Sequence, residues 1–174
     1  MTDRAPARDG ARPSRSRPAM PSIATDVLVC GSSDRGDDGA PIAAAAALRA
    51  DLPADVRVRV VGRLDIDDLL DVPAGARVVI VDAAIGIRPG EIVELPLTGL
   101  LGGRERVRPR SSHALAIPEV IGLAGLLRGR PLEGRVVVIG GVGFGLGTSL
   151  SPGVARAIPA LVRAIRDAVE RDRA

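Results

Sequence analysis

Two short apolar runs constrain the fold of this chain most strongly. Residues 78–81 read VVIV and residues 136–139 read VVVI, and neither run contains a polar residue. Runs of β-branched residues of this length are typical of strands that are buried on both faces, as in a parallel sheet covered by helices. The chain is therefore expected to form a central parallel sheet.

Segments with strand-like and helical patterns alternate around these two runs. Further strands are expected at residues 27–31, at 56–61, where arginines alternate with apolar residues as in a half-exposed or edge strand, and at 91–97, in an antiparallel direction. Helices are expected at residues 38–50, 117–127 and 154–169, with a short helix or turn at 64–70 and a mobile loop at 98–110. Pro159 is expected to kink the last helix or break its first turn. This order predicts a three-layer α/β fold, helix/sheet/helix, with a mostly parallel sheet of about five strands.

Length and charge set the domain organisation. A chain of 174 residues suits one domain, here residues 23–174, and residues 1–22 are rich in Arg, Pro, Ala and Ser and are expected to be a disordered tail. Met20 near its end is a candidate natural start. The tail carries five arginines and two aspartates, which leaves 19 arginines and 19 acidic residues in the remainder. The neutral domain has one aromatic residue, Phe144, and does not support nucleic-acid binding.

Cysteine content and hydropathy bear on location. The one cysteine, Cys30, cannot form an internal disulfide, as is usual in a reducing cytosol. No run of 18 apolar residues occurs, and no apolar segment follows the basic N-terminus as in a secretory signal. The sequence therefore predicts a cytoplasmic protein with no membrane association.

A polar loop after the first expected strand holds the main candidates for chemistry. Its sequence at residues 31–39 is GSSDRGDDG, with two adjacent carboxylates, Asp37 and Asp38. One interpretation is that both acids cap the following helix and complement its dipole. The other is that one of them points over the carboxyl end of the sheet, where open α/β sheets bind ligands, as a metal ligand or an acid–base group.

Two further residues are expected near that edge. Asp82 directly follows the run at 78–81, and His113, the one histidine, lies in a loop before the helix expected at 117–127. Either could simply meet solvent. Two carboxylates and an imidazole that converge would instead form an open donor set for Zn²⁺ or Ni²⁺, with water or substrate completing the shell.

The motifs, taken in order, resemble the hydrogenase maturation protease family. The resemblance covers about residues 26–170 and rests on four segments: G-x-x-x-x-G-D-D-G at 31–39, V-D-A at 81–83 followed by P-G-E at 89–91, S-H at 112–113, and L-S-P-x-V at 150–154. That family comprises nickel-dependent endopeptidases that remove a C-terminal extension from the large-subunit precursor of NiFe-hydrogenases after nickel insertion.

The resemblance implies roles for particular residues of this chain. Asp38, Asp82 and His113 would ligate the metal and act in catalysis, and the substrate-binding residues would be Gly36, Asp37, Gly39 and Ser112. The metal would be Ni²⁺ supplied by the substrate, with Zn²⁺ or Cd²⁺ able to occupy the site in vitro. The implied partner is the NiFe-hydrogenase large-subunit precursor, and the chain is expected to be a monomer. Either Asp37 or Asp38 could act as base, whereas Cys30 in a buried strand is not expected to be a nucleophile.

This chain departs from the family pattern in three places, and two other functions remain open. Ser32 stands where the family usually has Asn, Pro41 where it usually has Gly, and a glycine-rich segment at 140–147 where it commonly has acidic residues. The glycine-rich segment allows a nucleotide-binding module, although no helix opens directly after it. A non-catalytic chaperone that binds metal or precursor on the same fold is the other alternative.

Overall fold

The computed structural model describes residues 22–48, 52–102 and 116–171, and nearly all of the tail expected at residues 1–22 lies outside these ranges. Five strands form one sheet in the order β2-β1-β3-β5-β4. Three neighbouring strand pairs are parallel, and β4 runs antiparallel to β5. The strands are β1 (Thr25–Cys30), β2 (Val56–Gly62), β3 (Arg77–Ala84), β4 (Ile92–Pro96) and β5 (Gly134–Gly140).

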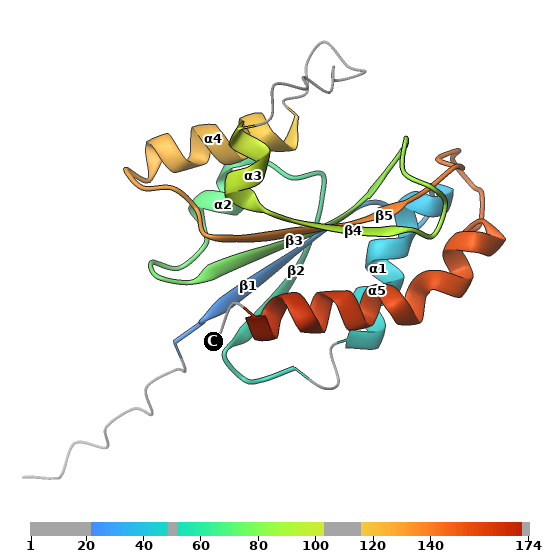
Figure 1. The fold of residues 1–174 in the computed structure, drawn as a ribbon, viewed down its shortest axis with the longest axis horizontal. Helices are drawn as coiled ribbons and strands as arrows, with labels where there is room; N and C mark the ends of the chain where they lie inside the picture. The colour runs from blue at the N-terminus through green and yellow to red at the C-terminus, as the bar shows by residue number, and fades with distance from the viewer. Residues whose placement is uncertain (1–21, 49–51, 103–115, 172–174) are drawn as a thin grey trace, which may run out of the picture.

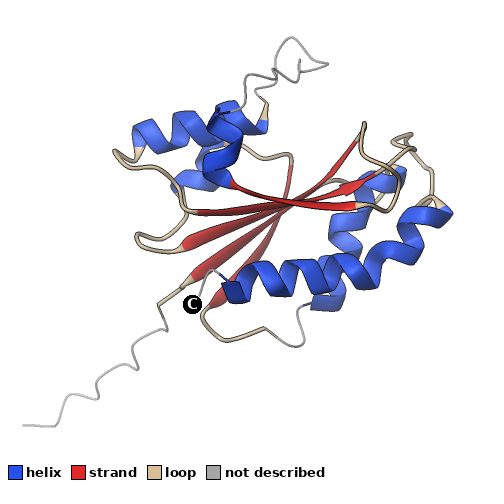
Figure 2. Cartoon of the chain, in the orientation of Figure 1, coloured by secondary structure: helices blue, strands red, loops and turns tan. Residues whose placement is uncertain are grey.

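Helices cover both faces of this sheet, as Figures 1 and 2 show. A 3₁₀ turn, η1 (Gly36–Gly39), leads into α1 (Ala40–Leu48), which packs with α5 (Pro152–Arg171) on one face. The other face carries α2 (Ile66–Leu70), α3 (Leu97–Gly102) and α4 (Ile117–Leu127). The three-layer fold expected from the alternation of strands and helices is confirmed.

The two faces of the sheet belong to two apolar clusters. Val27 and Val29 of β1 face the cluster under α1 and α5, whereas Leu28 and Cys30 face the cluster under α2, α3 and α4. The runs at 78–81 and 136–139 likewise supply both clusters, with side chains alternating between them. A strand buried on both faces has no polar alternation, because neither face meets water.

Most element predictions are confirmed, and two need correction. β2 is an edge strand and β4 is antiparallel, as expected. The segment expected as a loop at 98–110 instead begins with helix α3, while residues 103–110 lie outside the described ranges. The first helix begins at Ala40 rather than Asp38, because residues 36–39 form the tighter 3₁₀ turn. Helix α5 is continuous from Pro152 to Arg171, with Pro159 inside it.

None of the helices in the described ranges is both long and apolar enough to cross a membrane.

Candidate functional site

Asp38 is placed by a turn that only glycine permits. Gly31 follows β1 with φ +115°, and a Cβ there would lie 2.1 Å from the backbone oxygen of Asp38. The Gly31 amide donates to the carbonyl of Gly62 at 2.6 Å, and the Ser32 amide donates to the carbonyl of Asp38 at 3.2 Å. The chain therefore folds back at the end of β1, and Asp38 is held at the carboxyl edge of the sheet.

Asp82 reaches the same edge from β3. It shares the side-chain alternation of Val78 and Ile80, which belong to the cluster under α2, α3 and α4, so it lies on that face of the sheet. The backbone amide of Ala83 donates to Asp82 Oδ1 at 2.8 Å.

The two aspartates line one cavity of about 550 Å³. It is larger than the hollow at the opposite end of the sheet, about 180 Å³, and the hollow beside α4, about 400 Å³. Its lining comes from the ends of β1, β2 and β3 and the start of α4: Cys30, Gly31, Ser32, Arg35, Asp38, Gly62, Arg63, Leu64, Asp82 and Ile117. The carboxyl ends of three parallel strands thus form the hollow, as is usual for binding sites of open α/β sheets.

Both carboxyl groups have raised pKa values. Burial raises the pKa of Asp82 to about 6; the amide of Ala83 opposes this shift and the charge of Asp38 adds to it. Burial also raises the pKa of Asp38, against the lowering effects of Arg35 and the Ser32 backbone. Within the described part of the chain, neither carboxylate forms an ion pair. The cavity therefore holds two acidic groups that form no ion pair within the described residues, although the charge of Arg35 acts on Asp38.

Asp37 is buried on the inner side of the turn and does not reach this cavity. Its Oδ2 accepts from the backbone amides of Val142 at 2.8 Å and Gly143 at 3.0 Å, and its Oδ1 accepts from the amide of Ser151 at 2.6 Å. Burial alone would raise the pKa of Asp37, but these hydrogen bonds outweigh it and lower the pKa. The carboxylate ties η1 to the loop between β5 and α5.

Close packing around Asp37 explains several glycines. A Cβ on Gly141 would lie 2.8 Å from the Asp37 Cβ, and one on Gly36, at φ +60°, would lie 2.4 Å from the Gly143 carbonyl oxygen. Gly39 is buried as well. Gly36, Asp37 and Gly39, the substrate-binding residues that the resemblance implies, are all buried in the joint between two loops, and their contact with substrate stays a prediction. The expected capping role is wrong for Asp37, since the cap position of η1 is Arg35.

The third expected ligand, His113, and its neighbour Ser112 lie outside the described residues. Within the described ranges, no group of three or more His, Cys, Asp or Glu side chains is arranged to hold a metal ion. The pair of Asp38 and Asp82 is accordingly a two-carboxylate site to which further donors must be added. Oxygen ligands of this kind suit a divalent cation, which would offset the cost of burying the two carboxylates.

Cys30 lines the cavity but lacks the features of a nucleophile. It is 3% exposed, and burial followed by the charges of Asp82 and Asp68 raises the pKa of its thiol. A reactive cysteine requires the opposite environment, one that stabilises the thiolate. Sequence reasoning missed Arg63 and Leu64 at this cavity, although both follow the end of a parallel strand and could have been placed at the edge by the rule that placed Asp82.

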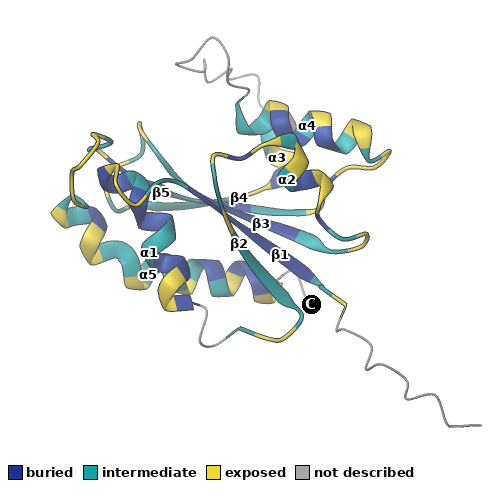
Figure 3. Ribbon diagram, turned by 180° about the vertical axis from the view of Figure 1, so that it is seen from behind, coloured by how far each residue is buried: buried dark blue, intermediate teal, exposed yellow. Residues whose placement is uncertain are grey.

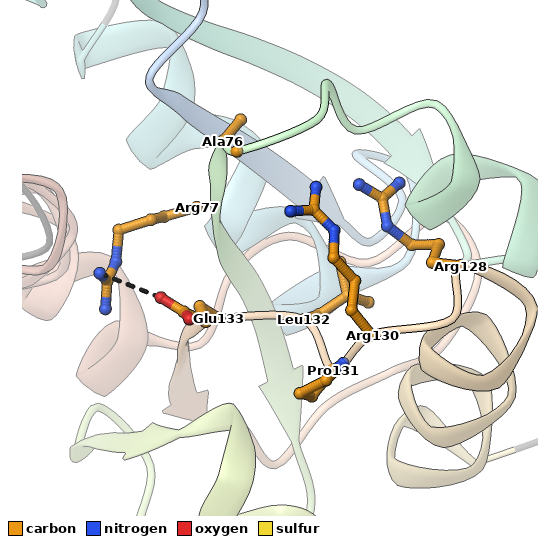
Figure 4. A pocket seen from close by; sticks show the side chains of 8 residues that line it. Ala76, Arg77, Arg128, Arg130, Pro131, Leu132 and Glu133 are labelled. Carbon is orange, nitrogen blue, oxygen red and sulfur yellow. Dashed lines mark ion pairs between the residues drawn. The ribbon is translucent and has the colours of Figure 1, made fainter.

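The hollow at the other end of the sheet has a different character. Figure 4 shows Arg128 and Arg130 beside the ion pair of Arg77 with Glu133, whose charged atoms are 3.3 Å apart. Arg128 Nη1 donates to the carbonyl oxygens of Leu69, Leu70 and Val72, at 2.9 to 3.1 Å. The hydrogen bonds of Arg128 therefore go to the carbonyl groups at and after the end of α2. Among the residues that line this hollow, Glu133 is the one acidic residue.

The glycine-rich loop does not have the geometry of a nucleotide-binding turn. Helix α5 begins at Pro152, well after β5 ends at Gly140. In a dinucleotide fold the loop amides and the helix N-terminus would face a pyrophosphate. Here the amides of Val142 and Gly143 already donate to Asp37, so a carboxylate of the chain itself occupies that position.

Comparison with known proteins supports the fold through structure alone. No protein-family model matches the sequence, and none of the curated proteins matches it. Among solved structures, the hydrogenase maturating endopeptidase HybD from E. coli is 19% identical, with a TM-score of 0.70 over 84% of this chain and 92% of that chain.

Two structures from Thermococcus kodakarensis are also similar. The [NiFe] hydrogenase maturation protease HybD from Thermococcus kodakarensis is 26% identical, with a TM-score of 0.63 over 82% of this chain and 97% of that one. HycI, a [NiFe] hydrogenase maturation protease from Thermococcus kodakarensis KOD1, is 19% identical, with a TM-score of 0.65 over 85% and 93% of the two chains. The chain thus has the α/β fold of the hydrogenase maturation proteases, which supports the family resemblance carried by its motifs.

Proposed function

We propose that this chain is an endopeptidase that removes the C-terminal extension of a NiFe-hydrogenase large-subunit precursor after nickel has been inserted. The observation that carries the proposal is the cavity that contains Asp38 and Asp82, neither of which forms an ion pair within the described residues, on a fold shared with solved maturation proteases. A precursor that carries nickel would bring a divalent cation to these two carboxylates.

Three residues would act as ligands of the nickel. Asp38 and Asp82 would provide oxygen ligands for the nickel of the substrate, and His113 a nitrogen ligand. Three residues of chain separate His113 from Ile117, which lines the cavity, so the Cα atoms of these two residues lie at most about 14 Å apart. This short separation along the chain supports His113 as the further ligand.

A divalent cation at this position would polarise the scissile carbonyl or lower the pKa of a bound water. Asp38, whose raised pKa brings it closer to neutral pH, would then accept a proton from the attacking water. Cys30 is held as a buried thiol and would take no part in bond cleavage. Asp37 would act indirectly, by holding η1 so that Asp38 keeps its position.

Co-expression with a nickel-loaded large-subunit precursor tests the proposal. The wild-type chain should shorten the precursor at its C-terminus, as measured by intact mass. Asp38→Asn, Asp82→Asn and His113→Ala should each reduce the rate at least about 100-fold, as expected when a metal ligand is lost. Asp167→Asn, on the exposed side of α5, is the matched control and should cleave normally. Normal shortening by all three variants would refute the assignment.

Metal binding gives a second measurement that does not depend on cleavage. Zn²⁺ or Ni²⁺ should raise the melting temperature of the wild-type chain by mass action, because it binds the folded state. The same addition should leave the melting temperature of Asp82→Asn nearly unchanged. A non-catalytic binding protein would show this shift and yet leave the precursor intact, which separates the two functions.

A further inference from the structure

The two edges of the sheet are protected to different degrees. Strand β4 is five residues long, ends at Pro96, and its Glu94 is paired with Arg135 and Arg171. Proline and charged side chains are common means of preventing an edge strand from pairing further. Strand β2 is seven residues long and contains no proline.

Among the described residues, nothing pairs with the outer side of β2 along most of its length. Its inner side pairs with β1 from Thr25↔Val56 to Cys30↔Gly62. Between Arg57 and Gly62, no described residue makes a backbone hydrogen bond to the outer side of the strand. In Figure 3 the strand lies at the margin of the sheet, with no other strand beyond it. A row of unpaired amides and carbonyls is a template for another extended chain.

The free edge leads into the cavity with the two aspartates. Gly62 ends β2, and Gly62, Arg63 and Leu64 line that cavity together with Asp38 and Asp82. The register of β2 on β1 shifts between Val29 and Cys30, which marks a bulge or another irregularity at this end. Bulges turn a strand and are frequent next to active sites. An extended segment paired with β2 would therefore be directed at Asp38 and Asp82.

Charge at the end of the strand indicates what such a segment carries. Arg63 is exposed, and no acidic side chain of the described ranges pairs with it. Arg57 and Arg59 are already committed to Asp26 through their guanidinium groups. Arg63 is therefore the cation of β2 and its end that remains available to a carboxylate on a partner.

We infer that the free edge of β2 binds an extended segment of the substrate protein as a sixth strand, with an acidic residue of that segment opposite Arg63. The inference rests on the proposed function and adds how the substrate is held. Strand addition gains affinity from main-chain hydrogen bonds that any sequence can make, while side chains set the specificity. A peptide bond held in this way is already extended and accessible when it reaches the cavity.

Site-specific photo-crosslinking tests the inference on the full chain. The photoreactive residue p-benzoylphenylalanine replaces Val60 on β2, 47% exposed, or Leu95 on β4, 41% exposed, as the matched control. Each variant is irradiated with a NiFe-hydrogenase large-subunit precursor, and the crosslinked peptides are identified by mass spectrometry. The position at Val60 should crosslink the C-terminal region of the precursor, and the position at Leu95 should not.

The possible results separate the inference from the proposed function. Precursor trimming with no crosslink from Val60, equal crosslinking from Leu95, or a crosslink only between two copies of this chain would overturn the inference and leave the proposed function standing. A wild-type chain that trims no precursor would overturn both.

Kinetics of Arg63→Gln give an independent measurement. Loss of the guanidinium should raise KM about tenfold and leave kcat nearly unchanged, because the contact serves binding and not the chemical step. The Zn²⁺-induced shift in melting temperature should persist in this variant, since Arg63 is not a ligand. A fall in kcat with KM unchanged, or loss of the Zn²⁺ shift, would contradict the role in binding the segment.

Discussion

The same face of the sheet carries acidic residues at both ends, and the two ends stabilise them differently. At the amino end of β1, the fully buried Asp26 accepts from Arg57 at 2.6 and 3.0 Å and from Arg59 at 2.9 and 3.4 Å. At the carboxyl end, Asp38 and Asp82 share a cavity with no ion pair among the described residues. The amino end, where arginines pair with Asp26, is called the paired end, and the carboxyl end, where Asp38 and Asp82 have no ion pair among the described residues, is called the open end.

The difference separates a structural cluster from a candidate site. Burying a carboxylate costs free energy unless a cation or hydrogen bonds replace its water. Asp26 meets that requirement within the chain, so its charge needs no other partner. Asp82 does not, and its pKa rises to about 6 in consequence. Uncompensated charge of this kind is expected where a cation from another molecule completes the site.

The largest expected loss of stability is at the paired end. Asp26→Asn should lower the free energy of unfolding by about 3 kcal/mol, because it removes the buried anion to which both guanidinium groups donate, although Arg59 keeps Asp68 and Asp71 at 3.8 and 3.9 Å. Both arginines are partly exposed, at 34% and 21%, which keeps the loss at the low end of the range for buried pairs. Urea denaturation at neutral pH measures it. If Asp26→Asn lowers the free energy of unfolding no more than Asp167→Asn does, the ion pairs of Asp26 do not stabilise the fold, and the proposed difference between the two ends is wrong.

An Asp→Asn substitution at the open end should change the free energy of unfolding in the opposite direction. Asp82→Asn should raise the free energy of unfolding of the metal-free protein by about 3 kcal/mol at pH 7.5, since the pKa rises from 3.8 to about 6 and each pKa unit corresponds to about 1.4 kcal/mol. A carboxyl group with a raised pKa contributes stability below its unfolded pKa, and this is lost as pH rises through the folded value near 6. The gain of the variant should therefore disappear near pH 4. A destabilised variant at pH 7.5, measured with chelator present, would contradict this account.

Asp37 offers a third means of stabilising a buried carboxylate, with amides in place of a cation. Asp37→Asn should cost about 2 kcal/mol at neutral pH, because an amide NH₂ would face backbone donors that now have an acceptor. The pKa of Asp37 is lowered, so its contribution is present above the unfolded pKa and is lost as pH falls through the folded value. Denaturation curves at neutral and acidic pH measure both. A loss of stability that is equal at neutral and acidic pH would show that the negative charge of Asp37 does not account for its contribution.

The smallest effect is expected at Cys30, which lies at the open end of this face. Its thiol has a raised pKa and is buried, so labelling by a thiol reagent at pH 8 should be much slower in the native protein than in urea. Asp82→Asn removes one of the charges that raise this pKa and should speed native labelling slightly. Labelling as fast as in urea would mean that the cavity opens in solution, and that Asp82 is solvated there.

The layers of the fold were predictable because their signals are local. A buried strand needs apolar residues on both faces, and the runs at 78–81 and 136–139 provide them within four residues. Asp38 and Asp82 could be placed at one edge for a related reason, since both follow parallel strands. Arg57 and Arg59 show the limit of such reasoning. Their alternation correctly indicated an edge strand, but not that both arginines bind a buried acid.

The sequence by itself determined the order of strands and helices along the chain, the partial exposure of β2 and the presence of acids at the carboxyl end of the sheet. It could not decide between Asp37 and Asp38, which are the same residue type at adjacent positions. Only the tertiary structure separates them, because the partners of Asp37 lie more than 100 residues further along the chain, at Val142, Gly143 and Ser151. No local period encodes a contact of that separation. Burial and charge compensation arise only when the loops after β1 and β5 meet, and they make one aspartate a structural tie and leave its neighbour facing the cavity.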